Sequence, residues 1–358
     1  MTRSSAIARV NCHTHIYSGL APLGMLPPRV KPANFVQILE RVWWKLDRAL
    51  DEASLRASAR YYVAESLLAG TSTLIDHHES PNLIEGSLDI LADACDELGM
   101  RGLLCYGATE RNGGRDEARR GLEECRRFIT SNRRAAIVGA VALHASFTVS
   151  DDIIREAGDL CRELGAIMHV HVAEDRADVD DAIWRGYPGP LERLLDLGAL
   201  PRGSILAHGV HLDELQVARA SEAGLWLVQN PRSNRGNGVG YPRALSHSQR
   251  VALGTDGYPA RMHDEADALL DEAQAHGERP GAVARRIDSG WRLVREAFKL
   301  ADNQIDETQW EDGALVSMRI GEREVVREGR LVSADIELIH ADAVEQAARL
   351  WKRMENRN

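Results

Sequence analysis

Short apolar runs alternate with longer segments of helical period along most of this chain, and this alternation restricts its fold more than any other feature. The runs are rich in β-branched residues, as expected for buried strands. Eight of them precede position 256, at residues 6–12, 72–76, 101–106, 137–143, 166–172, 203–207, 225–229 and 250–254. Eight strand–helix units predict an α/β fold, a (β/α)8 TIM-like barrel, with an open doubly wound sheet as the alternative.

The helical segments between the runs have readable ends. Helices are expected over residues 54–70, 82–99 and 150–165, with Ser54 and Ser150 as N-caps and a glycine at each C-terminal end.

Polar residues stand at the ends of almost all the runs. In a parallel barrel these strand ends meet on one face, where active sites are built. The residues are His13, His15, His77, His78, Tyr106, His144, His169, His171, His208, Asn230 and Asp256. Their convergence favours the barrel and predicts a polar site at its mouth.

His13 and His15 begin a candidate metal site. Residues i and i+2 of a strand face the same side, as two ligands of one metal ion must, although such a pair also arises by chance. In the stretch His169–Glu174, one histidine can bind metal while Glu174 reaches the bound water as general acid or base. Catalytic zinc commonly has about three His, Asp or Glu ligands and one water.

Four further residues have both a functional and a structural interpretation. Asp256 suits a fourth ligand that also accepts the proton of the water, or a turn aspartate. His208 and His144 suit a role in polarising or binding a substrate, or are buried core histidines. Trp44 falls off the apolar stripe of its helical segment and could line a pocket or an interface.

Composition and absent motifs exclude several classes of protein. The formal net charge of −10 argues against nucleic acid or an anionic membrane as the main partner. No apolar run is long enough for a membrane span or signal peptide, so a cytoplasmic protein is expected. Five widely spaced cysteines without C-x-x-C indicate neither a disulfide framework nor a thiolate metal site. The H-E-x-x-H, G-x-S-x-G and P-loop patterns are missing.

The pattern changes beyond about residue 312. Residues 314–333 look like short strands with turns, followed by a helix over 342–354. We expect a barrel domain over 1–312 and a segment 313–358 of short strands and a C-terminal helix packed on the barrel. The helix has an apolar stripe of Val344, Ala347, Ala348, Trp351 and Met354. Because exposed strand edges and apolar faces tend to be covered, a homodimer is also expected.

Several motifs together resemble the amidohydrolase superfamily. They agree in order and spacing with its guanine deaminases, adenosylhomocysteine deaminases and triazine hydrolases, and three longer stretches, residues 34–47, 75–82 and 143–148, are similar to SsnA-type aminohydrolases. The motifs are Asn11–His15, His171 with Glu174, Ala207–Gly209, Asn230–Asn234 and Gly254–Gly257.

The resemblance implies a metal-dependent hydrolase with a small-molecule substrate. It implies one divalent metal ion, zinc first with Fe²⁺ or Mn²⁺ as alternatives, held by His13, His15, His171 and Asp256. Glu174, His208 and Asp256 would carry the catalysis, and His144, His208, Asn230 and Trp44 would bind the substrate. In the family a metal-bound hydroxide attacks an amino-substituted C=N carbon, which implies deamination of a nitrogen heterocycle or cyclic amidine with release of ammonia. Hydrolysis of another C–N or C–Cl bond, or an inactive barrel that binds a ligand or partner, are the alternatives.

Two departures from the family set further expectations. Only twelve residues precede His13, so the family's small β-sandwich is expected to be reduced to a C-terminal hairpin or meander. Gly107, Gln229, Arg235 and Gly236 differ from the residues expected in SsnA-type sequences, which leaves the substrate open.

Overall fold

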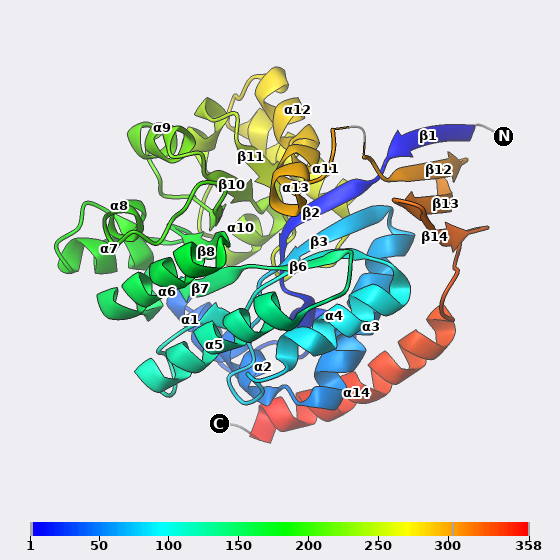
Figure 1. Ribbon diagram of the computed structural model, residues 1–358, viewed down its shortest axis with the longest axis horizontal. Helices are drawn as coiled ribbons and strands as arrows, with labels where there is room; N and C mark the ends of the chain where they lie inside the picture. Colours follow the sequence, from blue (N-terminus) through cyan, green and yellow to red (C-terminus); the bar gives the residue numbers. More distant parts are fainter. Residues whose placement is uncertain (1–2, 303, 357–358) are drawn as a thin grey trace.

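Parallel strands around a central axis form the core of the computed structural model, which describes residues 3–302 and 304–356 (Figure 1). Two hydrogen-bonded parallel sheets, β2-β3-β4-β6 and β5-β7-β8-β9-β10-β11, make up the barrel. The strands are β2 (Arg9–Thr14), β3 (Thr71–Asp76), β4 (Arg101–Leu104), β5 (Gly107–Ala108), β6 (Ile137–Gly139), β7 (Val141–Ala145), β8 (Met168–Val172), β9 (Ile205–His208), β10 (Trp226–Gln229) and β11 (Val251–Leu253). The predicted (β/α)8 barrel is confirmed, with its third and fourth strands each broken into two pieces.

The ring of strands closes between the first and the last. Thr14 and Asp256 form a parallel bridge, and the carbonyl of His13 accepts hydrogen bonds from the backbone N–H groups of Thr255 (2.9 Å) and Asp256 (3.0 Å). Closure therefore brings the two ends of the barrel sequence together at the site face.

Helices cover the outside of the barrel and cross its two ends. They are α1 (Phe35–Ile38), the π-helical turn η2 (Leu39–Trp43), α2 (Trp44–Ala49), α3 (Glu52–Leu68), α4 (Ser87–Leu98), α5 (Arg115–Ser131), α6 (Asp151–Leu164), α7 (Arg176–Trp184), α8 (Pro190–Asp196), α9 (Glu214–Glu222), α10 (Pro231–Asn237), α11 (Met262–Ala275), α12 (Pro280–Asp288) and α13 (Gly290–Phe298), with 3-10 turns η1 (Ile16–Ser18), η3 (Ser146–Thr148) and η4 (Arg243–His247). The helix expected from Ser54 begins earlier, because Asp51 is its N-cap and Ser54 completes a capping box three residues on. The helix expected from residue 82 begins later, at Ser87.

Apolar side chains fill the end of the barrel opposite the polar site. Strand residues such as Val10, Ile205 and Trp226 form one buried cluster with Leu293 and Val294 of α13. These packed side chains close one end of the barrel, so its open face is at the C-terminal ends of the strands.

A five-stranded antiparallel sheet stands beside the barrel, in the order β1-β12-β13-β14-β15 (Figure 1). Its strands are β1 (Arg3–Ile7), β12 (Glu307–Glu311), β13 (Ala314–Ile320), β14 (Arg323–Arg327) and β15 (Arg330–Leu331). The expected meander is confirmed and is larger than expected, because the N-terminal strand β1 pairs with β12 and both lie before residue 312. The division into two domains at residue 312 stays a prediction.

Buried polar contacts attach this sheet to the barrel. The guanidinium of Arg101 on β4 donates to both oxygens of Asp306, next to β12, and neither side chain is more than 9% exposed. Arg323 on β14 donates to the carbonyls of Asp96 and Glu97, each at 2.8 Å, at the end of α4. The sheet is therefore fixed at the end of the barrel remote from the polar site.

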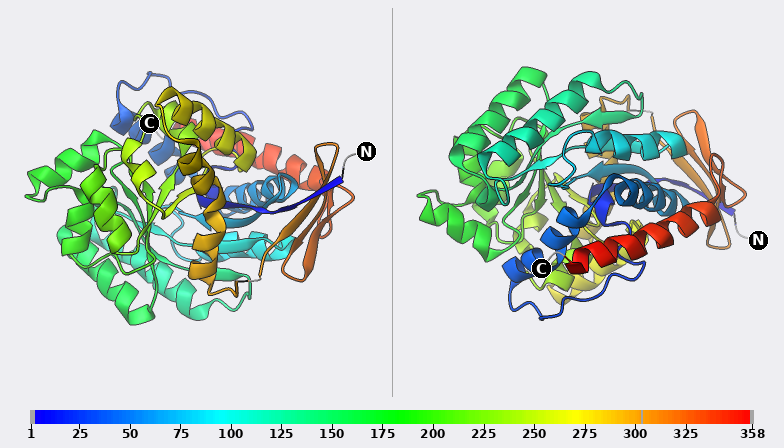
Figure 2. Two further views of the ribbon diagram at one scale, coloured as in Figure 1. Left: turned by 90° about the horizontal axis from the view of Figure 1, so that it is seen from above. Right: turned by 90° about the horizontal axis from the view of Figure 1, so that it is seen from below.

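Helix α14 (Ile336–Asn356) runs along α3 and α2 on the outside of the barrel (Figure 2). Its buried face differs from the expected stripe. Val344 and Ala348, which belong to that stripe, are exposed in the structure. The face consists of Ile339, Ala343, Ala347 and Leu350, each at most 2% exposed, with Trp351 and Met354 partly buried. The expected stripe was wrong for Val344 and Ala348, because the face that packs on α3 and α2 is centred on Ala343, Ala347 and Leu350 and leaves these two residues outside it. Among the described residues, no helix has the length and apolar character required to cross a membrane.

Candidate active site

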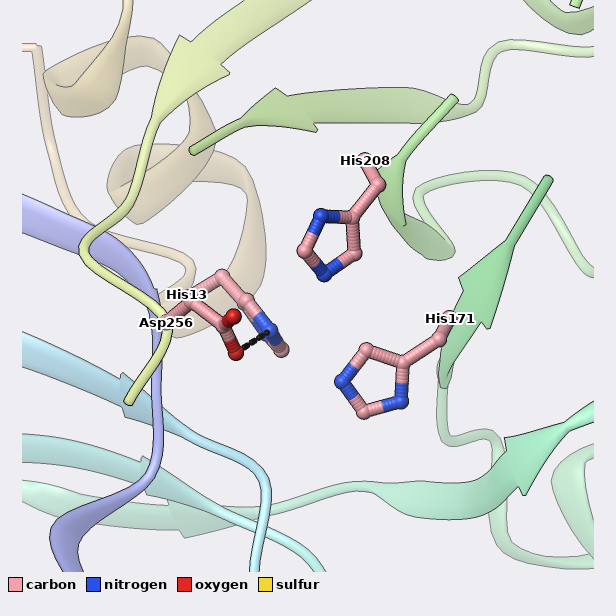
Figure 3. A group of neighbouring side chains, drawn as sticks. All are labelled: His13, His171, His208 and Asp256. Carbon is pink, nitrogen blue, oxygen red and sulfur yellow. Dashed lines mark ion pairs between the residues drawn. The ribbon is translucent and has the colours of Figure 1, made fainter. Parts of the chain in front are cut away.

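Polar side chains from the first and last strands meet those of the middle strands at the open face of the barrel. Donor atoms of His13, His171, His208 and Asp256 all lie within 4.8 Å of one another. Figure 3 shows these four side chains pointing towards a common space from separate strand ends.

His15 joins the same group. Its Nε2 lies 2.9 Å from Asp256 Oδ1 and 3.2 Å from Nε2 of His171. His13 Nε2 lies 3.4 Å from the same carboxylate oxygen. The four ligands expected from the resemblance, His13, His15, His171 and Asp256, are thus brought together.

The Nδ1 atom of each of these histidines is held by a hydrogen bond on the side away from the group. Nδ1 of His15 donates to the carbonyl of His77 at 2.5 Å, and Nδ1 of His171 donates to that of His144 at 2.6 Å. His13 Nδ1 hydrogen-bonds His169 Nε2 at 3.0 Å, so His169 lies behind the group rather than in it. Such contacts set the tautomer and orientation of a metal-binding imidazole.

The donor set fits a divalent metal ion. His13 Nε2 is buried and has no hydrogen-bond partner among the described residues, although an unpaired buried nitrogen is costly. The His15 and His171 Nε2 atoms lie 3.2 Å apart and both Nδ1–H groups are used elsewhere, so when both rings are neutral their Nε2 lone pairs face each other. A cation between them removes this conflict, and three imidazoles with a carboxylate suit zinc and similar ions.

Burial and neighbouring charges set the ionisation of the group. Burial lowers the pKa of His13 to about 3. The pKa of His15 is raised to about 10, because Glu79 and Asp256 outweigh the opposing effect of burial. Burial raises the pKa of Asp256, but the nearby imidazoles of His13 and His15 reverse this and hold it well below the usual range.

Glu174 lies beside the cluster, in the loop after β8. Burial, followed by the charge of Asp256, raises its pKa well above the ordinary value, so it tends to keep a proton. Its Oε2 is 3.5 Å from Nε2 of His208, whose own pKa is lowered by burial. An ionised and a protonated carboxyl next to each other are typical of an acid–base pair.

Three residues at this face have left-handed backbone conformations. They are Ala173 (φ 51°), His208 (φ 74°) and Asp256 (φ 54°). Such conformations cost free energy in residues with a Cβ atom and concentrate at functional sites.

A cavity opens over the cluster, between the strand ends and the segment α1–α2. Trp44 and His144 both line it, with ring centroids 6.2 Å apart, and the Arg111 guanidinium lies 4.8 Å from the Trp44 ring. The other lining residues include Phe35, Leu39, Trp43, Phe147, Asp47, Glu79, Glu174 and Asp256. The cavity thus combines aromatic walls with a polar floor, as small-molecule sites do.

The remaining strand-end residues take different places. Asn230 lies behind His208, with Nδ2 3.3 Å from His208 Nδ1, and is not among the residues that line the cavity. His77 faces inwards, its ring centroid 4.5 Å from that of His171. His78 turns away and hydrogen-bonds Ser80 at 2.7 Å.

Several residues of the site were not expected from the sequence. Asn237 Nδ2 donates to Glu174 Oε1 at 3.3 Å, and Ser233 on the same helix donates to Asp256. Asp47 accepts from Arg111 at 2.9 Å at the cavity wall. The short helix α10 lies directly after Asn230, but only the folded chain shows that two of its polar residues reach the carboxyl groups.

Comparison with known proteins agrees with this architecture. The model of the amidohydrolase family matches residues 7–301. A 5-methylthioadenosine/S-adenosylhomocysteine deaminase of Pyrococcus abyssi is 27% identical over 271 residues, 73% of this chain and 60% of that protein. An 8-oxoguanine deaminase of Pseudomonas aeruginosa is 27% identical over 320 residues, 83% of this chain and 70% of that protein. The chain therefore spans only about 60% of the Pyrococcus relative.

Solved structures share the fold at low sequence identity. An adenosine deaminase from Xanthomonas campestris with bound zinc has a TM-score of 0.81 at 18% identity, covering 97% of this chain and 86% of its own. An atrazine chlorohydrolase from Arthrobacter aurescens with zinc has a TM-score of 0.78 at 18% identity, covering 96% and 88%. Since the family match extends over most of the barrel and the strand-end residues converge as its fold requires, the chain belongs to the amidohydrolase family.

Proposed function

We propose that this protein is a metal-dependent aminohydrolase that removes an amino group from a nitrogen heterocycle or cyclic amidine and releases ammonia. The observation that carries the proposal is the meeting of His15 Nε2 and Asp256 Oδ1, 2.9 Å apart, in a cavity that the half-buried carboxyl of Glu174 also lines. The names of the deaminases most similar in sequence support a C–N bond as the one that is broken.

His13, His15, His171 and Asp256 would hold one divalent ion. Zinc is the first candidate, with Fe²⁺ or Mn²⁺ as alternatives, because imidazole and carboxylate ligands suit all three. When bound, the ion would acidify a water molecule and polarise the substrate. Zinc in the two neighbouring structures supports this choice.

Glu174, Asp256 and His208 would move the protons. Glu174 tends to keep a proton and can give it to a ring nitrogen of the substrate, while the ionised Asp256 can accept one from water. His208, 3.5 Å from Glu174, can polarise the same region. In the net reaction one water is consumed, the C–N bond breaks, a C=O bond forms and ammonia leaves.

His144 and Trp44 would contact the substrate, since both line the cavity and their rings suit a flat heterocycle. Asn230 was expected to do the same, but its side chain lies outside the cavity lining. We propose instead that Asn230 acts through His208, which its amide contacts.

Two coarser features complete the proposal. The five cysteines are all unpaired and buried, as in proteins of the reducing cytoplasm, where we place this protein.

We also propose a homodimer. Light scattering tests this, because a monomer mass that does not change with concentration would exclude it.

An ammonia-release screen over purines, pyrimidines, pterins and triazines, combined with metal analysis of the purified protein, tests the function. We expect close to one divalent ion per chain and ammonia released from at least one heterocycle. Chloride instead of ammonia would identify C–Cl hydrolysis by the same residues. A protein that binds metal and ligand without turnover would be the inactive barrel.

A further inference from the structure

Glu79 is a buried carboxylate at the end of β3 that the proposed chemistry does not use. Its exposed fraction is 2%, and one of its oxygens lies 3.5 Å from Nδ1 of His15, a residue of the candidate metal centre. Burying a carboxylate is costly unless it is paired, so its surroundings need an explanation.

Two histidines surround this carboxylate. Glu79 Oε1 pairs with His77 Nδ1 at 2.8 Å, and Oε2 lies 3.5 Å from His15 Nδ1. The other ring nitrogen of His77 donates to the carbonyl of Leu143 at 3.1 Å, which fixes the ring across to β7. The His77 carbonyl accepts from His15 Nδ1. Nδ1 of His15 is thus held both by the backbone carbonyl of His77 and by the charge of Glu79.

Gly107 is what leaves room for this pair. A Cβ atom at this position would lie 2.5 Å from His77 Cε1 and 2.8 Å from Glu79 Oε1, closer than real Cβ contacts. Only glycine fits against the pair without moving it.

We propose that Glu79 is a positioning residue for the metal ligand His15, and that Gly107 is required for it to reach its place. The carboxylate acts through the His15 imidazole, since it makes the ring more basic and keeps Nε2 directed at Asp256. This inference rests on the proposed metal centre.

Metal affinity tests it directly. The apo-protein is titrated with Zn²⁺ against a competing chelator, and with Co²⁺, whose visible absorption spectrum reports the ligand geometry. Glu79→Gln keeps the volume but loses the charge, and we expect affinity for both ions to fall about 10- to 100-fold. Gly107→Ala should lower affinity in the same direction. The double variant should lose little more than the worse single variant, because both changes act on one unit.

Glu124→Gln is the matched control. Glu124 is also 2% exposed and hydrogen-bonded, to Arg127 at 2.8 Å and the Leu88 backbone at 3.2 Å, but lies on α5 away from the site. Its variant should bind metal as the parent does. Melting temperatures of the apo-forms separate folding from metal binding, and Glu79→Asp, which restores the charge, should recover part of the affinity. If the Glu79→Gln variant binds both ions as tightly as the parent, the inference is overturned. If the parent itself binds no metal, the proposed function fails instead.

Discussion

His15 and Asp256 are held together twice, once through their side chains and once through their backbones. Nε2 of His15 lies 2.9 Å from Oδ1 of Asp256, and the backbone N–H of His15 donates to the Asp256 carbonyl at 3.3 Å. The second contact lies next to the Thr14–Asp256 bridge that closes the barrel. The contacts that close the barrel therefore also bring His15 and Asp256 together at the site.

Replacing His171 by alanine should remove most of the bound metal, because one of the four proposed ligands is lost. His169→Ala is the matched control, since its ring contacts His13 Nδ1 from behind and should leave most of the metal in place. Metal content after dialysis against a weak chelator measures both. Equal loss from the two variants would show that His169 also binds the ion.

Glu174→Gln should retain metal but lose activity by a factor of about 10² to 10⁴, because the amide keeps the shape and removes the proton. Steady-state rates and metal content of the same preparation decide this. A fully active variant would show that Asp256 or His208 moves the proton without Glu174.

Asn237→Leu should lower kcat about 5- to 30-fold while metal content stays unchanged. The Asn237 amide donates to Glu174 at 3.3 Å, and a hydrogen bond to a charged or catalytic carboxyl contributes about 1–2 kcal/mol. Asn237→Ser, which can still donate, should recover part of the rate. A change confined to KM would mean that Asn237 binds the substrate instead of orienting Glu174.

Leu350→Ala should lower the free energy of unfolding by about 2–5 kcal/mol, because the side chain is fully buried between α14 and the barrel helices. Val344→Ala on the same helix is the control, since Val344 is 46% exposed and should change stability by less than about 0.5 kcal/mol. Denaturant unfolding of both variants measures the difference. Similar losses would favour the stripe read from the sequence and place Val344 in an interface, as a homodimer could.

Deletion of residues 313–358 should leave the protein poorly soluble. It removes β13–β15 and α14, exposing the partner edge of β12 and the apolar face of α3. Solubility and melting temperature of the shortened chain measure this. A variant as stable as the parent would show that the segment is dispensable and support the division at residue 312.

The barrel and the kind of site at its mouth could both be predicted from the sequence. The β-branched runs and their spacing impose strands and helices locally, and parallel strands in a barrel all end on one face, so residues such as His13, His171 and Asp256 had to meet. The repeated alternation of strands and helices was sufficient for this prediction, because it identifies the barrel in which those strand ends meet.

Tertiary structure decided what surrounds these residues. The sequence predicted no role for Glu79, Asn237 or Asp47, because their contacts depend on distances across the barrel that no local pattern encodes. The same holds for β1, whose five exposed residues carry little strand signal until β12 pairs with them, and for α14, whose buried face is set by its packing on α3 and α2. Pairing and packing partners fix these features, and those partners are distant in the sequence.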